Sequence, residues 1–217
     1  MKPMERGVLD KINGNTDAGL SHRGEYDIVA LAASAGGLRS LSHVLEALPA
    51  EFPAALVVVQ HLDPRHRSLM VDILRRRIAL KVKEAEEGDI LQPGKVYTAP
   101  PNKHLLVNSD GSLSLTQTEL VHFVRPSADL LFESTAASYK DRVVAVVLSG
   151  SGKDGSLGVK AVKKMGGSVI IEDERTAEFS GMPGAAMETG CVDFALPLDE
   201  IAPALVKLVV REVAHGR

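Results

Sequence analysis

Three apolar runs of strand length constrain the fold of this chain more than any other feature. They lie near residues 27–33, 55–61 and 143–149. Amphipathic stretches with helical spacing follow them, near 38–48, 67–78 and 155–165. Continuous apolar strands that alternate with helices are typical of a parallel sheet covered on both faces. The sequence therefore predicts an α/β fold, with a doubly wound, mostly parallel sheet and helices on both faces.

The middle of the chain has a different pattern. Short stretches alternate polar and apolar residues, at 95–98, 104–107 and 112–115. An Asp-Gly pair at 110–111 separates the last two stretches. Such a pair between alternating runs is a strong signal for a tight turn. We therefore expect an inserted β-hairpin in this region.

The alternation of helices and strands resumes after the hairpin. Ser127 is a candidate N-cap for a helix that runs through Tyr139, because its hydroxyl can accept a free N–H of the first turn. Further strands are expected at 168–172 and 192–196. A C-terminal helix is expected to begin at about Asp199.

Length and composition predict one domain. The 217 residues are 45% hydrophobic, which is enough for one full-sized core. Residues 1–25 are polar, and we expect a disordered N-terminal tail there, followed by a single catalytic domain over residues 26–217. The chain has 25 basic and 28 acidic residues and no long run of like charge, so nucleic acid is not an expected partner.

The sequence contains no signal for export or for membrane insertion. The first residues lack the apolar region of a secretory signal, and no apolar run reaches about 18 residues. The single cysteine, Cys191, excludes an internal disulfide and is expected to be a small core residue. No Cys/His cluster has the spacing of a metal site. We expect a soluble, cytoplasmic protein without a metal or an organic cofactor.

Ser34, His61 and Asp154 each lie just beyond the carboxyl end of an expected strand. In open α/β sheets, ligands bind at this edge. A serine becomes a useful nucleophile when an imidazole takes its proton and a carboxylate orients that imidazole. These residues therefore predict a Ser-His-Asp triad, in which Ser34 attacks, His61 is the base and Asp154 orients the base.

Acyl transfer also requires donors for the oxyanion that develops on the carbonyl oxygen. Backbone N–H groups next to Ser34, at Ala35, and within the glycine-rich loop 150–152 are the candidates. Such groups at the start of a helix are well suited to bind a negative charge.

Each of these residues also has a simpler structural interpretation. Ser34 could open a phosphate-binding turn or cap a helix, although the turn has neither the G-x-G-x-x-G pattern nor the lysine of a P-loop. His61 could be a structural histidine, and Asp154 a turn former or a helix cap. The other histidines considered, His66, His104 and His122, are expected on the surface. It is the joint placement of the three residues at strand ends that favours catalysis.

The chain order of the three residues separates this protein from one common class. Ala32-x-Ser34-x-Gly36 nearly matches the G-x-S-x-G nucleophile elbow of the α/β-hydrolases. That fold places the acid before the histidine, whereas His61 precedes Asp154 here. We therefore expect a different α/β fold.

Several ordered motifs resemble the catalytic domain of the CheB-type chemotaxis protein-glutamate methylesterases, in the form fused to methyltransferase domains in hybrid signalling proteins. The resemblance extends from about Tyr26 to Val210. Three motifs hold the expected nucleophile, base and acid: ASAGG at 33–37, VQHL at 59–62 and LSGSGKDG at 148–155. Four others are EAEEG at 84–88, YTAPPNKH at 97–104, RPSAD at 125–129 and FSGMP at 179–183.

The resemblance implies hydrolysis of glutamate γ-methyl esters on the cytoplasmic helices of chemoreceptors, with release of methanol. It also implies that glutamine deamidation is open to this chemistry. By carry-over, Ser34, His61 and Asp154 form the triad, and the N–H groups of Ala35 and Ser151 form the oxyanion hole. No cofactor is implied.

The resemblance also suggests two substrate-binding residues, Arg125 and Met182. Arg125 could contact an acidic receptor helix or could be a solvated loop arginine. Gly184 departs from the family pattern, which carries Arg or Lys there, so one positive charge near the substrate groove is missing. Residues 1–25 cannot form a receiver domain, so the domain is expected to be either constitutively open or controlled by a separate regulator. A methyltransferase is a further expected partner.

Other functions stay open at this point. The same triad could serve a protein-glutamine deamidase or another serine esterase, because the acyl-enzyme chemistry is shared. An inactive adaptor that only binds a receptor is an alternative from a different class. The intact Ser34, His61 and Asp154 favour an enzyme.

Overall fold

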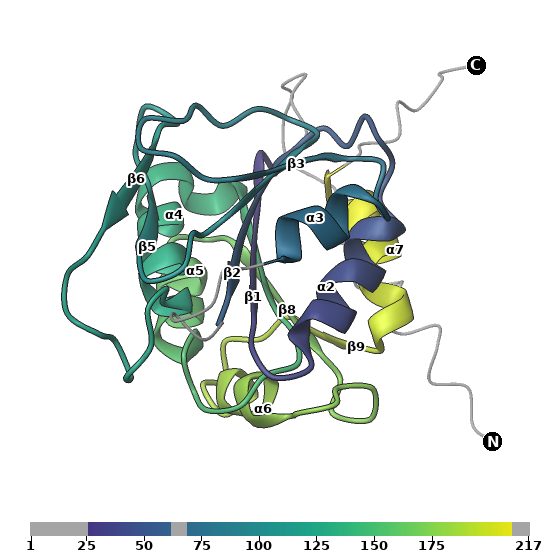
Figure 1. Ribbon diagram of the computed structural model, residues 1–217. Helices are drawn as coiled ribbons and strands as arrows, with labels where there is room; N and C mark the ends of the chain where they lie inside the picture. Colours follow the sequence, from purple (N-terminus) through teal and green to yellow (C-terminus); the bar gives the residue numbers. More distant parts are fainter. Residues whose placement is uncertain (1–25, 62–68, 210–217) are drawn as a thin grey trace, which may run out of the picture.

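The computed structural model describes residues 26–61 and 69–209 (Figure 1). Its centre is a seven-stranded sheet with the order β3-β4-β2-β1-β7-β8-β9, and every neighbouring pair is parallel. The strands are β1 (Ile28–Ala33), β2 (Ala55–Gln60), β3 (Lys81–Glu84), β4 (Lys95–Thr98), β7 (Val143–Val147), β8 (Ser168–Glu172) and β9 (Phe194–Leu196). The predicted α/β fold class is confirmed. The predicted tail at residues 1–25 lies outside the described residues.

The central strands are buried on both faces, which explains their continuous apolar sequences. All six residues of β1 and all six of β2 are buried. Side chains alternate along a strand, so Val29 and Leu31 belong to one core cluster and Ile28 and Ala30 to the other. An apolar strand with no polar face therefore requires a helical layer on each side.

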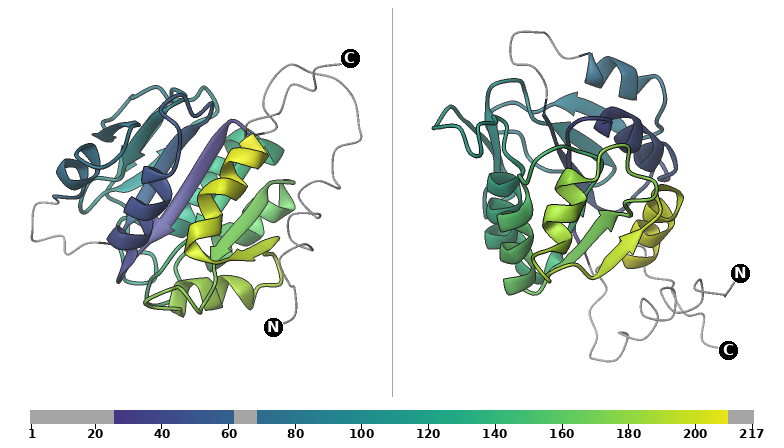
Figure 2. Two further views of the ribbon diagram at one scale, coloured as in Figure 1. Left: turned by 90° about the vertical axis from the view of Figure 1, so that its right-hand side faces the viewer. Right: turned by 90° about the horizontal axis from the view of Figure 1, so that it is seen from below.

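Helices supply both layers (Figure 2). One core cluster joins the sheet to α2 (Gly37–Glu46), α3 (Met70–Arg75) and α7 (Leu198–Val209). The other joins the opposite face to α4 (Ala128–Tyr139), α5 (Ser156–Lys164) and α6 (Gly181–Met187). Ser127 is the N-cap of α4, as predicted, and its hydroxyl accepts the N–H of Leu130.

A separate antiparallel pair, β5 (His104–Val107) and β6 (Leu113–Thr116), packs against α4. It is the predicted hairpin, and its connection contains Asp110 and the positive-φ Gly111. The neighbouring stretch 95–98 does not belong to this hairpin. It forms β4 and, with β3, extends the main parallel sheet beyond β2.

The strand order creates a switch point at the carboxyl end of the central strands. From β1 the chain crosses to β2 on one side, and from β7 it crosses to β8 on the other side. The connections that follow the neighbours β1 and β7 therefore leave in opposite directions, which is the arrangement that creates a ligand site in doubly wound sheets.

Candidate active site

The three residues of the predicted triad follow adjacent strands. Ser34 follows β1, His61 follows β2, and Asp154 lies in the loop after β7. Ala33 and Gln60 are register partners, and the N–H of His61 donates to the Ala33 carbonyl at 3.0 Å. The register therefore brings the residues that follow, Ser34 and His61, to the same edge of the sheet.

His61 and Asp154 are in direct contact. The distance from His61 Nε2 to Asp154 Oδ2 is 2.8 Å, and the two side chains are 11% and 3% exposed. Because an ionised carboxylate only accepts, Nε2 carries the proton in this pair. Nδ1 is then the ring nitrogen that can take a proton from a nucleophile.

Asp154 is held by the start of α4 as well as by His61. Its carboxylate accepts hydrogen bonds from Ser127 Oγ (2.9 Å), the Ala128 N–H (2.6 Å) and the Asp129 N–H (3.1 Å). Burial alone would raise the pKa of Asp154, but the bond from His61 and those from the helix N–H groups outweigh burial, and the pKa lies below its ordinary value. Asp154 is thus an ionised group in a fixed orientation.

Ser34 lies in a tight turn against the loop that follows β7. Its N–H donates to the Ser149 carbonyl at 3.0 Å. A Cβ on Gly150 would lie 3.0 Å from Ser34 Cβ and 2.3 Å from Met182 Sδ, so only glycine allows this approach. Within the described residues, Ser34 Oγ makes no hydrogen bond to His61. Such bonds commonly tighten only when substrate is bound.

The two predicted oxyanion donors have no partner inside the described part of the chain. Neither the Ala35 N–H nor the Ser151 N–H donates to another described residue. Ala35 is partly exposed and Ser151 is exposed. Their role as oxyanion donors stays a prediction.

Ser149 joins three segments around the serine turn, although the sequence analysis did not single it out. Its hydroxyl donates to the Ala35 carbonyl at 2.9 Å and accepts the Phe179 N–H at 3.0 Å. Its own N–H donates to Glu172 Oε2 at 2.9 Å, and both Ser149 and Glu172 are fully buried. No local pattern marks such a residue, because its partners are distant in the sequence.

The two predicted substrate-binding residues are firmly held. The Arg125 guanidinium donates to Asn102 Oδ1 at 2.8 and 3.0 Å, and to the carbonyls of Gln117 and Thr118. Met182 is 1% exposed and packs beneath Gly150, to whose carbonyl its N–H donates. A direct contact of either residue with substrate stays a prediction.

The other histidines differ from expectation in one case. His104 was expected on the surface, but it is fully buried, because the segment that follows β6 covers it and its Nε2 contacts the Glu119 carbonyl at 3.0 Å. His122 is partly exposed and contacts Asp129 at 3.1 Å. His66 lies outside the described residues.

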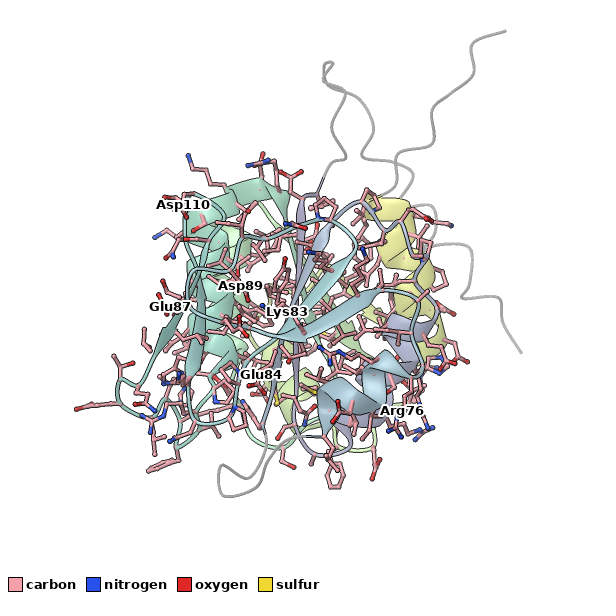
Figure 3. All side chains as sticks on the ribbon, turned by 45° about the horizontal axis from the view of Figure 1, so that its top comes forward. Arg76, Lys83, Glu84, Glu87, Asp89 and Asp110 are labelled. Atoms are coloured by element: carbon pink, nitrogen blue, oxygen red, sulfur yellow. The ribbon has the colours of Figure 1, made fainter. Side chains whose placement is uncertain are left out.

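A depression lies over β3, and none of the predicted triad residues lines it. Its volume is about 380 Å³, and its lining includes Arg75, Lys83, Glu84 and Glu86. Lys83 reaches Asp89 at 2.8 Å, and the two side chains point toward one another in Figure 3. Because acidic and basic groups already pair there, the depression has no uniform charge.

The described residues hold neither a candidate metal site nor a membrane-spanning helix. No group of three or more His, Cys, Asp or Glu side chains in 26–61 and 69–209 could hold a metal ion. No helix in this part of the chain is long and apolar enough to cross a membrane.

Serine, histidine and aspartate side chains lie at the carboxyl ends of adjacent parallel strands, which is the set of groups that serine hydrolases use. The family model described as CheB methylesterase matches residues 29–205. The chain belongs to this family and is a hydrolase of the methylesterase class, as its motifs predict.

Similar proteins agree with this assignment. A protein of Burkholderia lata named protein-glutamate methylesterase/protein-glutamine glutaminase 2 is 41% identical over 87% of this chain and 56% of its own length. A Leptospira interrogans relative named for the same two activities is 39% identical over 84% of this chain and 95% of its own length. The crystal structure of the Thermotoga maritima CheB methylesterase catalytic domain matches with a TM-score of 0.82 and 40% identity, over 85% of this chain and 99% of that chain.

The two sequence relatives differ in how much of them this chain spans. It covers almost all of the Leptospira protein but little more than half of the Burkholderia protein. The match to the Thermotoga structure extends over almost all of that catalytic-domain chain.

Proposed function

We propose that this protein hydrolyses glutamate γ-methyl esters on chemoreceptors or a related signalling protein in the cytoplasm, and releases methanol. The observation that carries the proposal is the His61–Asp154 hydrogen bond beside Ser34, at the carboxyl edge of three adjacent strands. The names of the relatives support this substrate class.

The proposed reaction begins when Ser34 Oγ attacks the ester carbonyl carbon and His61 Nδ1 takes the hydroxyl proton. Asp154 stabilises the resulting imidazolium. The carbonyl oxygen becomes an oxyanion, which accepts hydrogen bonds from the N–H groups of Ala35 and Ser151. Collapse of this intermediate breaks the bond between the carbonyl carbon and the methoxy oxygen. The methoxy group takes the proton from His61 and leaves as methanol.

A water molecule then completes the cycle. His61 takes one proton from the water molecule, and the water oxygen attacks the acyl carbon. The second collapse returns the proton to Ser34 and leaves a free glutamate side chain. With a glutamine substrate the same steps release ammonia in place of methanol, so we include deamidation in the proposal.

The partner in this proposal is a helical, acidic segment of a methylated receptor. The Met182 N–H donates to the carbonyl of Gly150, next to Ser151, and Arg125 lies two residues before Ser127, whose hydroxyl donates to Asp154. These positions support a role for both residues near substrate. Gly184 has nothing within 4 Å of an added Cβ. A Gly184→Arg variant therefore has room for the positive charge that the family pattern carries there.

The test is methanol release from a methyl-esterified cytoplasmic receptor fragment, beside ammonia release from a fragment with glutamines at the same positions. We expect the wild type to release methanol and Ser34→Ala to release none above background. If the folded wild type releases neither product, the Gly184→Arg variant separates the remaining cases. Activity gained by that variant would indicate that the natural receptor of this protein differs in charge from the test fragment. Continued inactivity with retained receptor binding would support the adaptor and contradict the proposal.

A further inference from the structure

We propose that Gln60 is a positioning residue that aims the Ala35 N–H at the oxyanion. The inference rests on the proposed function, since it assigns a task within the same site. Gln60 is the last residue of β2 and directly precedes His61. Its side chain is buried, with 5% of the residue exposed.

The amide of Gln60 contacts both the serine turn and the base. Its Nε2 donates to the Ser34 carbonyl at 2.7 Å and to the His61 carbonyl at 3.2 Å. An amide nitrogen has two hydrogens, so these contacts use its full donor capacity. One buried group thus fixes the backbone of the proposed nucleophile relative to that of the proposed base.

The contacts that fix the orientation of the Ser34 carbonyl also fix the orientation of the Ala35 N–H. The two groups belong to one planar peptide unit, and in a trans peptide they point in opposite directions. The Ser34 carbonyl is held from the inside by Gln60 and by the Gly37 N–H at 2.9 Å. The Ala35 N–H therefore points away from Gln60, and it has no partner within the described residues.

The surroundings of Gln60 indicate that the donor group is what the site requires. A Cβ on Gly37 would lie 2.6 Å from Gln60 Oε1, so the glycine at the start of α2 leaves room for the amide. Gln60 Oε1 itself is buried and has no hydrogen-bond partner. A buried unpaired acceptor is destabilising, and an apolar side chain of similar length would avoid it. Packing alone therefore does not account for glutamine at this position.

Two variants separate positioning from packing. Gln60→Met keeps the length of the side chain and removes both donors. Gln60→Glu keeps the shape and replaces the donor nitrogen by an oxygen. The control is Thr98→Val, which removes a buried hydroxyl on β4. Val58 on β2 pairs with Thr98, and within residues 26–61 and 69–209 the hydrogen-bond partner of the Thr98 hydroxyl is the Lys83 carbonyl, at 3.4 Å.

The first readout is the rate at which a fluorophosphonate probe labels Ser34, because phosphonylation also develops charge on an oxygen in the oxyanion hole and needs no receptor. The second is kcat and KM for methanol release, beside the melting temperature. Loss of one oxyanion donor typically costs 10²–10³ in kcat, so a misaimed donor should cost roughly 10–100-fold in both rates. We expect KM to change by less than about twofold, since the donor acts in the transition state.

Folded Gln60 variants that label at the rate of Thr98→Val, or that raise KM without lowering kcat, would overturn the inference. Loss of folding in both variants would assign Gln60 to stability and would also overturn it. A wild type that is labelled at Ser34 but releases no methanol contradicts the proposed substrate alone, and the labelling rates still test Gln60.

Discussion

Asp154 and Asp129 hold the starts of each other's helices. The Asp154 carboxylate, just before α5, accepts N–H groups at the start of α4, including that of Asp129. The Asp129 carboxylate, in the first turn of α4, accepts the N–H groups of Leu157 and Gly158 in α5, at 2.9 and 2.8 Å. Negative groups at helix N-termini are stabilising. This pairing fixes the proposed triad acid to two rigid elements.

Asp129→Ala should lower the free energy of unfolding by about 2 kcal/mol, because it leaves two N–H groups of α5, the partly buried one of Leu157 and the buried one of Gly158, without an acceptor. Burial raises the pKa of Asp129, against the lowering effect of the Gly158 N–H. The neutral Asp129→Asn variant should therefore stay within about 1 kcal/mol of the wild type. Urea denaturation measures both, and equal stability of the Ala and Asn variants would contradict the capping role.

Asp154→Asn should reduce kcat by roughly 10³–10⁴, because an amide no longer stabilises the imidazolium of His61. It should also change the acid response of stability. The folded-state pKa of Asp154 lies below its ordinary value of 3.8. Its contribution is therefore present above pH 3.8 and is lost as the pH falls from there toward the lower folded-state pKa.

Denaturation between pH 6 and pH 3 tests this sign. The free energy of unfolding of the wild type should fall more steeply at the acid end than that of Asp154→Asn. Parallel curves for the two proteins would mean that folding does not lower the pKa of Asp154.

Two glycines provide a matched pair for packing. A Cβ on Gly158 would lie 2.6 Å from the Cβ of Phe132, where α5 crosses α4. Gly158→Ala should therefore cost about 1–3 kcal/mol through overpacking. Gly184→Ala, in the exposed part of α6, meets nothing within 4 Å and should be neutral or stabilising by up to about 1 kcal/mol. Melting curves of both variants measure the change in stability. A Gly158→Ala variant as stable as Gly184→Ala would show that α4 and α5 can separate at little cost.

Arg125 should contribute to stability through its fork of hydrogen bonds as well as through charge. Arg125→Lys keeps the charge but cannot reproduce the paired contacts with Asn102 Oδ1 and the two carbonyls. We expect a loss of about 1–2 kcal/mol. A double-mutant cycle with Asn102→Ala measures the coupling of the pair, and additive losses would show that Arg125 and Asn102 act independently.

The sequence was sufficient to predict the parallel sheet, the hairpin and the Ser127 cap, because each has a local signal. Runs such as 55–60 are apolar throughout, and a hairpin turn requires particular residues. The place of β3 and β4 at the sheet edge was not predictable, because their short alternating patterns resemble those of the hairpin strands. The seven-residue α6, with its Gly and Pro, has no helical periodicity to detect.

The residues of the candidate site also fall into those with a local sequence signal and those without one. The common location of Ser34, His61 and Asp154 at one edge of the sheet was predictable, because each follows a strand whose end the pattern marks. Gln60 and Ser149 were missed because their importance depends on contacts across 26 and 114 positions of sequence. Asp129 was seen only as part of a motif, since its partners in α5 lie 28 and 29 residues away.

The most direct test of the proposed mechanism is to trap its covalent intermediate. The protein is incubated with a fluorophosphonate and digested, the labelled peptide is located by mass spectrometry, and methanol release is followed on the same samples. We predict one label, on Ser34, formed in step with the loss of methanol release, and labelling slowed by a thousandfold or more in His61→Ala. A label on another residue, or methanol release that persists in Ser34→Ala, would contradict the proposed mechanism.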